Sequence, residues 1–259
     1  MTALATALSA SAGRSPGGCI LVALTVLTGQ LSIGWSNDLL DVRRDRAAGR
    51  RDKPVAQGEI ATRTVAVACA AAVVACVPLS LANGWRAGVV HLLVVAGGWA
   101  YNLGLKASAL SWVPYATSFG LLGAFISFGL PGHPPPRPWV IAAGALLGVG
   151  AHFLNVLPDL DDDVSAGVRG LPHRLGRRRA QIGGALLLAA ATLVITLGPR
   201  EDVPLWAYGA MVFALVLAGL AATWRDDAPE RRSRAPFRLA LTTAALSILL
   251  LVARGSSLS

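Results

Sequence analysis

Apolar residues dominate eight stretches of the chain, each about as long as a membrane-spanning helix. A helix needs about 20 mostly apolar residues to cross the hydrocarbon core of a bilayer. Runs of this kind predict spans at 17–37, 61–82, 86–105, 112–130, 138–158, 180–198, 204–224 and 236–254. A ninth stretch, 2–13, is too short to cross unaided, and it is interpreted as a truncated first helix, a re-entrant segment or the result of a late start codon. The pattern predicts an all-α helical bundle that forms a single transmembrane domain over residues 1–259.

The composition supports a membrane protein, and the charge distribution orients it. Hydrophobic residues make up 54% of the 259 positions and charged residues only 14%, with a mean hydropathy of +0.57; soluble domains have about 25% charged residues. Eighteen of the 23 Lys and Arg residues lie on one side of the predicted spans, and the five on the other side are Arg14, Arg86, Arg137, Arg200 and Arg254. The positive-inside rule therefore predicts an integral, multi-pass protein of a bacterial-type cytoplasmic membrane. The same rule explains the net charge of +9 without a nucleic-acid partner.

Two polar segments interrupt this apolar background, and they resemble each other. Residues 34–58 and 155–176 each follow a predicted span and share the pattern N-x3-D-x3-D-x3-G-x-R-x2-P-x3-G at a constant offset of 118. The seven matched pairs are Asn37 with Asn155, Asp41 with Asp159, Asp45 with Asp163, Gly49 with Gly167, Arg51 with Arg169, Pro54 with Pro172, and Gly58 with Gly176. Matches without a gap predict two pseudo-repeated halves that face each other in the bundle. The segments predict two cap loops, 38–60 and 159–179, on the cytoplasmic side.

The spacing of the acidic residues predicts a metal site. Residues four apart lie about 40° from each other on a helix, so each copy presents one polar ladder of an asparagine and two aspartates. Oxygen ligands without a His or Cys cluster favour a hard cation, and a site with few carboxylates suits Mg²⁺ completed by substrate phosphates. Two Mg²⁺ ions would balance the four aspartates, and a bound diphosphate adds about −3 that basic residues neutralise. The predicted catalytic residues and metal ligands are Asp41, Asp45, Asp159 and Asp163, with Asn37 as a further metal ligand.

Polar residues around the two ladders are candidates for binding a diphosphate. Arginine is the better bidentate phosphate partner, and lysine supplies a compact charge. Any single juxtamembrane Arg or Lys is also explained as a topology determinant, which is the only interpretation given to Arg177–Arg179. Asp38, Asp161 and Asp162 lie off the ladders, so a solvated role explains them as well as ligation does. The candidates are Asn37, Asp38, Arg44, Arg51, Lys53, Lys106, Asn155 and Arg169, with Arg174 on the same side.

These motifs resemble those of a known family. The stretch "NDLLDVRRD" at 37–45 is similar to the N-D-x-x-D-x-x-x-D motif of the UbiA superfamily of intramembrane prenyltransferases. The stretch "DLDDDVSAGVRGLPHRLG" at 159–176 resembles the second motif of that superfamily, D-x-x-x-D. The similarity extends to "DKPVAQG" at 52–58 and to "YNLGLK" at 101–106, which adds Tyr101 to the substrate-binding candidates. It covers the chain from about residue 17 onward, and it departs at the N-terminus, where the first helix is short.

The resemblance implies nine helices around a central cavity, with both motifs in a cytoplasmic cap. It also implies Mg²⁺-dependent transfer of an isoprenoid from its diphosphate to an aromatic or other lipophilic acceptor. Metal and arginine would neutralise the leaving group, while the cavity walls keep a carbocation from water. His91 and His152 are interpreted as hydrogen-bonded packing residues, and His173 as a weaker candidate for contact with acceptor or phosphate. Candidates to face the cation, each with core packing as the alternative, are Trp35, Tyr101, Tyr115, Phe119 and Phe153.

Three functions of different classes remain open, and the leading one is prenyl transfer to an acceptor such as a quinone precursor resembling 4-hydroxybenzoate. The second is a membrane terpene cyclase, in which the prenyl chain's own double bond attacks. The third is a cation or proton transporter, which would need acids at mid-membrane depth, whereas these aspartates gather at one face. The acceptor, the prenyl chain length and the oligomeric state are left open by the sequence.

Overall fold

The computed structural model describes residues 1–47, 49–165, 167–199, 201–225 and 235–257. Several residues named in the predictions lie outside these ranges: Ala48 and Ala166 of the predicted cap loops, and Arg200, Arg231, Arg232 and Arg234 among the predicted topology determinants. The side chain of Asp162 also lies outside the described part.

The described residues form helices and no strand. The long helices are α2 (Pro16–Ala47), α4 (Thr62–Ala82), α5 (Trp85–Leu103), α6 (Val113–Phe128), α7 (Pro138–Asn155), α10 (Arg177–Leu197), α11 (Leu205–Thr223) and α12 (Ala235–Ala253). The short ones are α1 (Thr2–Ser11), α3 (Pro54–Gln57), η1 (Leu105–Ala107), α8 (Leu160–Ser165), α9 (Leu171–Leu175) and η2 (Gly255–Ser257). The predicted all-α fold is therefore confirmed for the described part of the chain.

Each of the eight predicted spans overlaps one long helix, and six helices are long and apolar enough to cross a membrane: α2, α4, α7, α10, α11 and α12. Helix α6 has only 16 residues, which corresponds to about 24 Å at 1.5 Å per residue and falls short of a bilayer core. Helix α5 is 19 residues long but includes an arginine, a histidine and two tryptophans. The chain has the helices of an integral membrane protein, and the exact number of spans stays a prediction.

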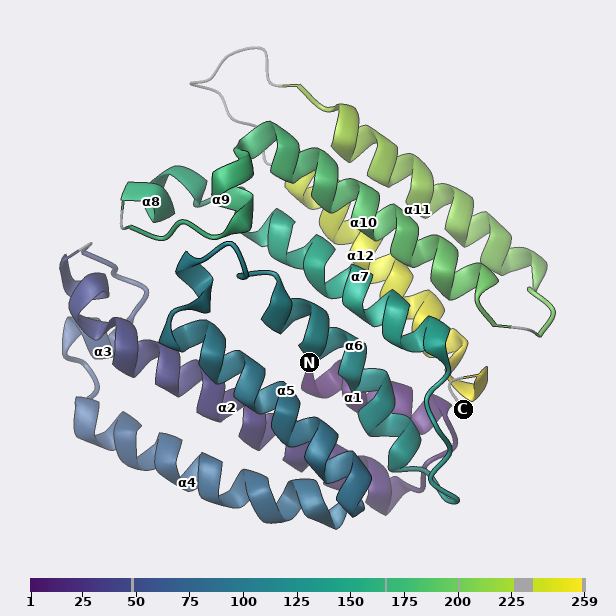
Figure 1. Cartoon of the computed structure of the whole chain (residues 1–259), viewed down its shortest axis with the longest axis horizontal. Helices are drawn as coiled ribbons and strands as arrows, with labels where there is room; N and C mark the ends of the chain where they lie inside the picture. Colours follow the sequence, from purple (N-terminus) through teal and green to yellow (C-terminus); the bar gives the residue numbers. More distant parts are fainter. Residues whose placement is uncertain (48, 166, 200, 226–234, 258–259) are drawn as a thin grey trace.

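The helices pack as a closed ring in chain order. Each of α2, α4, α5, α6, α7, α10, α11 and α12 contacts the next one, and α1 contacts both α2 and α12. Figure 1 shows the long helices running side by side, with α1 and α12 close together. Ala5 and Leu8 of α1 are fully buried, and the Ser11 side chain lies so close to Gly255 that a Cβ atom there would collide with it. The short first helix therefore closes the ring beside η2, and the predicted central cavity stays a prediction.

The turns that follow the two motifs have the same backbone conformation. Gly49 and Gly167 have positive φ angles of 63° and 82°, which favour glycine because it lacks a Cβ atom. The Arg50 N–H donates to the carbonyl of the last ladder aspartate in the first copy at 3.0 Å, and the matching Val168 N–H does the same in the second copy at 2.8 Å. The structure thus confirms the sequence repeat at these turns.

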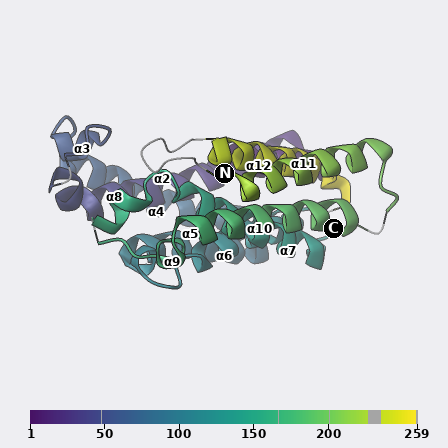
Figure 2. The same ribbon diagram turned by 90° about the horizontal axis from the view of Figure 1, so that it is seen from above.

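The short helices after these turns also correspond. Pro54 lies in the first turn of α3 and Pro172 in the first turn of α9, a position where the missing N–H of proline costs nothing. Both helices end before a glycine with positive φ, Gly58 at 81° and Gly176 at 77°. Figures 1 and 2 show α3, α8 and α9 at the same end of the bundle. The two motifs therefore share one face of the protein.

Candidate active site

The first ladder lies on one continuous helix. Helix α2 continues through Ala47, so Asn37, Asp41 and Asp45 occupy successive turns, as predicted. The two aspartates are buried, with 7% and 6% of their surface exposed. Carboxylates in such surroundings require a cation or several hydrogen-bond donors, because an unpaired buried charge is strongly unfavourable.

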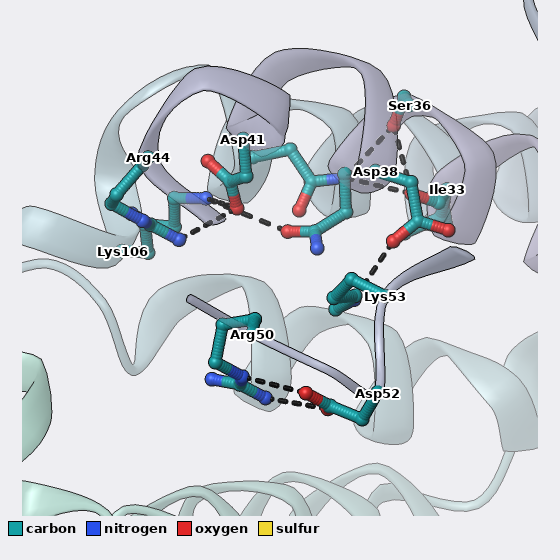
Figure 3. Close-up of polar contacts among 11 residues, drawn as sticks. Ile33, Ser36, Asp38, Asp41, Arg44, Arg50, Asp52, Lys53 and Lys106 are labelled. Atoms are coloured by element: carbon teal, nitrogen blue, oxygen red, sulfur yellow. Dashed lines mark hydrogen bonds and ion pairs between the residues drawn. The ribbon is translucent and has the colours of Figure 1, made fainter. Parts of the chain in front are cut away.

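Two basic residues meet at Asp41. The Lys106 ammonium group donates to Asp41 Oδ2, and Arg44 Nη2 donates to the same oxygen at 2.7 Å. Lys106 Nζ also lies 3.4 Å from Asn37 Oδ1. Lys106 comes from η1, whereas Arg44 is one helical turn away on α2. Figure 3 shows Arg44 and Lys106 converging on Asp41. With Asn37, three predicted substrate-binding residues meet around one predicted catalytic carboxylate.

The neighbouring polar contacts fix the loop after α2 and the end of α5. Lys53 Nζ donates to Asp38 Oδ1 at 2.7 Å, which ties the start of α3 back to α2 (Figure 3). The Asn102 amide donates to the Ile33 carbonyl and to Ser36 Oγ, both at 2.8 Å. Sequence reasoning missed Asn102, although it stands next to Tyr101 in the stretch "YNLGLK" and is buried. It positions the end of the helix that precedes Lys106.

Arg50 connects the two motifs electrostatically. Its guanidinium donates to both carboxylate oxygens of Asp52, at 2.9 and 2.8 Å. This hydrogen bond is the largest influence that raises the pKa of Arg50 above its ordinary value, and the carboxylates of Asp45 and Asp159 add to it. The same bond holds the pKa of Asp52 below its usual range. Sequence reasoning treated Arg50 only as a topology determinant, because it has no counterpart in the repeat pattern.

The second ladder differs from the prediction. Helix α7 ends at Asn155, and α8 begins only at Leu160, so Asp159 lies in the turn between them. Pro158 is the physical reason, since proline has no N–H and its ring collides with the carbonyl four residues earlier. Asn155 and Asp159 are both exposed, and neither forms a side-chain hydrogen bond or ion pair within the described ranges. The expectation of one continuous helical ladder in this copy is therefore wrong.

Two further acids of the second copy, Asp161 and Asp163, have basic partners. His173 Nε2 donates to Asp163 Oδ2 at 3.1 Å, and the His173 side chain is only 3% exposed. Arg177 Nη2 lies 3.6 Å from Asp161 Oδ2, so this arginine has a local partner in addition to its predicted topological role. The prediction that His173 contacts acceptor or phosphate is not tested by this contact. It does place His173 beside a predicted metal ligand.

The other arginines predicted to bind substrate lie at the surface. Arg51 is exposed and makes no side-chain hydrogen bond in the described part of the chain. The Arg169 side chain is exposed, and its backbone carbonyl accepts a hydrogen bond from Arg174 Nε at 2.9 Å. The structure therefore does not bring these three arginines together with the ladder acids. Their role in substrate binding stays a prediction.

Aromatic side chains gather between α5, α6 and α7. Tyr101 meets Tyr115 edge-on at a ring distance of 5.4 Å, and Tyr115 stacks on His152 at 4.3 Å. Phe153 is 6.2 Å from the His152 ring. Two other aromatic candidates, Trp35 and Phe119, form no close ring pair among the described residues. The cluster joins three of the five predicted aromatic candidates to His152, which was predicted to be a hydrogen-bonded packing residue.

His152 belongs to a buried polar network that sequence reasoning missed. Its Nε2 lies 3.0 Å from Ser111 Oγ, and the same oxygen accepts the N–H of Leu171 at 2.9 Å. Gly144 and Gly148 precede His152 at four-residue intervals, and Cβ atoms at these glycines would collide with the α6 backbone. This spacing was the available signal, because it places His152 on the face of α7 that contacts α6. The network ties α9 to the segment that follows Lys106.

The oxygen donors of the two motifs are few for a divalent cation that binds to protein alone. Among the residues that the structure describes, no three His, Cys, Asp or Glu side chains form a metal-binding cluster. Magnesium sites that act on phosphates use one or two carboxylates and complete their shell with water and substrate oxygens. The Asn37 and Asp41 oxygens already hold a cation, the Lys106 ammonium. These residues therefore fit a magnesium ion that binds together with a diphosphate.

Comparison with known proteins identifies the class. The chain matches the UbiA prenyltransferase family over residues 1–251. It is 25% identical over 235 residues to the digeranylgeranylglyceryl phosphate synthase of Natronomonas pharaonis, covering 88% of this chain and 84% of that relative. A solved structure of a digeranylgeranylglyceryl phosphate synthase is similar with a TM-score of 0.71 at 15% identity, over 98% of this chain and 91% of that one. A UbiA homologue from Archaeoglobus fulgidus bound to GPP and Mg²⁺ has a TM-score of 0.69 at 16% identity, over 96% of both chains.

The chain belongs to the UbiA prenyltransferase family. The match spans nearly the whole chain and includes both aspartate motifs. The solved relatives have the same helical fold. The protein is thus an integral membrane enzyme of the prenyl-transferring class.

Proposed function

We propose that this enzyme transfers a prenyl group from an isoprenyl diphosphate to a lipophilic acceptor within the membrane, with Mg²⁺ at the two aspartate motifs. The observation that carries the proposal is the pair of matched motifs at one end of the ring, in which Asn37 and Asp41 already hold a cation. A relative with the same fold binds GPP and Mg²⁺. Asn37, Asp41 and Asp45 would hold one ion and Asp159 and Asp163 a second.

Bound divalent ions would neutralise charge on the departing diphosphate and so favour breaking the allylic C–O bond. Arg44 and Lys106 supply positive charge at the same place, since both lie on Asp41. Tyr101 and Tyr115 form an aromatic wall near this end of α5 and α6, and aromatic faces stabilise a nearby cation by roughly 0.5–2 kcal/mol each. The acceptor then forms a new bond to the allylic carbon and releases a proton.

Two acceptor classes follow from different observations. The resemblance of the motifs to the UbiA superfamily implies an aromatic or other lipophilic acceptor, such as a quinone precursor. The relative named digeranylgeranylglyceryl phosphate synthase favours a lipid alcohol that carries a glyceryl phosphate. A cyclase would need no acceptor, because the double bond of the prenyl chain attacks instead.

The test is to incubate membranes that contain the enzyme with Mg²⁺ and prenyl diphosphates of graded length, with and without each acceptor. Mass spectrometry should detect acceptor plus one prenyl group, and EDTA should abolish the product. A cyclic hydrocarbon or alcohol formed without any acceptor would identify a cyclase instead. Prenylated product at an undiminished rate in EDTA would contradict the role of divalent ions.

The orientation belongs to the same proposal. The end of the bundle that carries α3, α8 and α9 would face the cytoplasm, since 18 of the 23 Lys and Arg residues lie on that side. Single cysteines placed at exposed Arg51 and at exposed Trp85 in a variant without the native cysteines test it. Labelling of intact cells with an impermeant maleimide should reach position 85 and not position 51. The reverse pattern would overturn the orientation.

A further inference from the structure

The ammonium group of Lys106 contacts two oxygens of the first ladder that are predicted metal ligands. It donates to Asp41 Oδ2 and lies 3.4 Å from Asn37 Oδ1. Both partners are nearly enclosed at this contact, because the side chain of Lys106 is 12% exposed and that of Asp41 is 9% exposed. The ammonium therefore occupies the position of a hard cation between an amide oxygen and a carboxylate oxygen one helical turn apart.

A divalent ion and this ammonium cannot share these oxygens. Magnesium requires oxygen ligands at about 2.0–2.1 Å in near-octahedral geometry, and a positive charge in contact with the same carboxylate oxygen repels it. Lys106 must move before Asn37 and Asp41 can ligate an ion. Moving an ammonium group out of a nearly enclosed ion pair is unfavourable unless it finds another anion.

Lysine is suited to such a movement. Lys106 carries a compact charge on four flexible methylene groups and lies in the short η1 segment after Gly104. Arg44 contacts the same Asp41 oxygen from three residues away on α2, but its side chain is 37% exposed, against 12% for Lys106, so it can turn into water without leaving an enclosed position. A diphosphate that enters between the motifs offers Lys106 a stronger anion than one carboxylate.

We propose that Lys106 keeps the Asn37 and Asp41 oxygens closed to divalent ions until a diphosphate draws its ammonium group away. This proposal rests on the proposed function, since it assumes a diphosphate substrate. It makes metal binding at the first motif depend on substrate binding. Lys106 would thus act first as an internal cation at the ladder and then as a partner of the diphosphate.

The second motif offers the contrast that isolates this effect. Within the described ranges, no Lys or Arg side chain forms a hydrogen bond or ion pair with the side chain of Asn155 or Asp159. In the absence of diphosphate, a divalent ion would therefore meet a free Asp159 in the second motif, where Asp163 contacts only His173 among the described residues, and a first motif that is covered by Lys106. An Asp159→Asn/Asp163→Asn background removes the second motif, so that binding of metal alone reports on the first.

The experiment measures Mn²⁺ affinity by electron paramagnetic resonance in this background, using the full chain in detergent and no diphosphate. Lys106→Met should bind Mn²⁺ about tenfold or more tightly than the background protein, because a contacting positive charge is gone. Lys106→Arg keeps the cation and should leave the affinity near that of the background. Lys53→Met is the matched control, since Lys53 pairs with Asp38 on the same helix but off the ladder; it should change the affinity less than about threefold.

Equal Mn²⁺ affinity of the background protein and Lys106→Met would overturn the proposal. An equal gain in Lys53→Met or in Lys106→Arg would overturn it as well, because the effect would then come from general charge or from disturbed packing. Failure of Lys106→Met to bind Mn²⁺ would also contradict it, since the freed oxygens should hold the ion. The Mn²⁺ affinities are measured without any prenyl-transfer reaction. A failed prenyl-transfer assay of the intact enzyme would therefore be a separate result that concerns only the proposed function.

Discussion

In the first copy of the motif the ladder helix continues to Ala47, whereas in the second copy the helix ends at Asn155 and a turn precedes Asp159. The position that is Leu40 in the first copy is Pro158 in the second. The turns and short helices that follow are alike, with glycines of positive φ at the same places. The two copies therefore share the conformation of the loop that follows the acids. They differ at the position of Leu40 and Pro158, and this residue determines whether the preceding helix continues through the acids or ends before them.

The environments of the acids differ in the same way. Asp41 and Asp45 are buried, and Asp41 is covered by Lys106 and Arg44. Asp159 is exposed. In the first copy Asp41 is covered by two basic side chains, whereas among the described residues of the second copy Asp159 is free and Asp163 contacts His173. The following predictions test how far this difference extends.

The largest effect is expected from the ladder acids. Asp41→Ala and Asp159→Ala should each lower product formation by about 10²–10³-fold, the loss typical of removing one strong electrostatic contact to a developing charge. Mass spectrometry of the prenylated product in Mg²⁺ measures it. Asp52→Ala is the control, since Asp52 is exposed and pairs only with Arg50 in the loop. Near-wild-type turnover of both ladder variants would contradict the assignment of the two motifs.

Exchanging the helix breaker between the copies should have unequal effects. Leu40→Pro should lower the free energy of unfolding by about 3 kcal/mol, because it removes an internal helix hydrogen bond in α2 and collides with the preceding turn. The leucine side chain itself is 48% exposed and contributes little packing. Pro158→Leu should leave the stability within about 1 kcal/mol, since the turn already satisfies the backbone there. Denaturant unfolding in detergent measures both, and equal losses would mean that proline does not explain the broken second ladder.

The buried Ser111, which anchors the second loop, should matter more for stability than the half-buried Ser108. Ser111→Ala should cost about 1–3 kcal/mol of stability, because it leaves the Leu171 N–H and His152 Nε2 without their buried partner. Ser108→Ala removes an exposed hydrogen bond from the Leu110 N–H and a part-buried one to the Leu105 carbonyl. Both partners are within reach of water, so its effect should be smaller. Thermal unfolding of the two variants in the same detergent compares them. A larger loss for Ser108→Ala would show that the Ser111 network does not hold α9.

The smallest expected difference in stability is between variants of Gly58 and Gly176, the glycines that follow α3 and α9. Gly58 has φ 81° and ψ 6°, a left-handed conformation that asparagine tolerates, whereas Gly176 has φ 77° and ψ 161°, a region almost restricted to glycine. Neither position has a neighbouring atom that a Cβ would meet. Gly176→Asn should therefore destabilise by about 1 kcal/mol more than Gly58→Asn. The same unfolding measurement tests this, and the opposite order would contradict the backbone difference between the loops.

The helices were predictable because the length of each apolar stretch can be read from the sequence. The repeat was predictable because its matched residues keep a constant spacing. Each predicted span overlaps a long helix, and the glycines predicted to match adopt matching conformations. The break at Pro158 was visible in the sequence, but the regular spacing of Asn155, Asp159 and Asp163 outweighed it. Spacing alone does not establish that a helix is continuous.

The partners of the acids were less predictable, because they come from distant segments. Lys106 reaches Asp41 from 65 residues away, and only the packing of α5 against α2 brings them together. His152 and Ser111 meet across 41 residues, and a single histidine in an apolar helix gives no sign of such a partner. Asn102, also missed, binds α2 from 66 and 69 residues away.

The cooperation of the two copies on one diphosphate is tested most directly by a double-mutant cycle on ligand binding. The measurement is the dissociation constant of a thiolo analogue of a prenyl diphosphate, which resists ionisation, in saturating Mg²⁺. If both copies act on the same diphosphate, Asp41→Asn and Asp159→Asn each weaken binding by about tenfold or more, and the double variant is weakened far less than the product of the two factors. Losses that multiply independently, or binding that survives either substitution unchanged, would contradict a shared site.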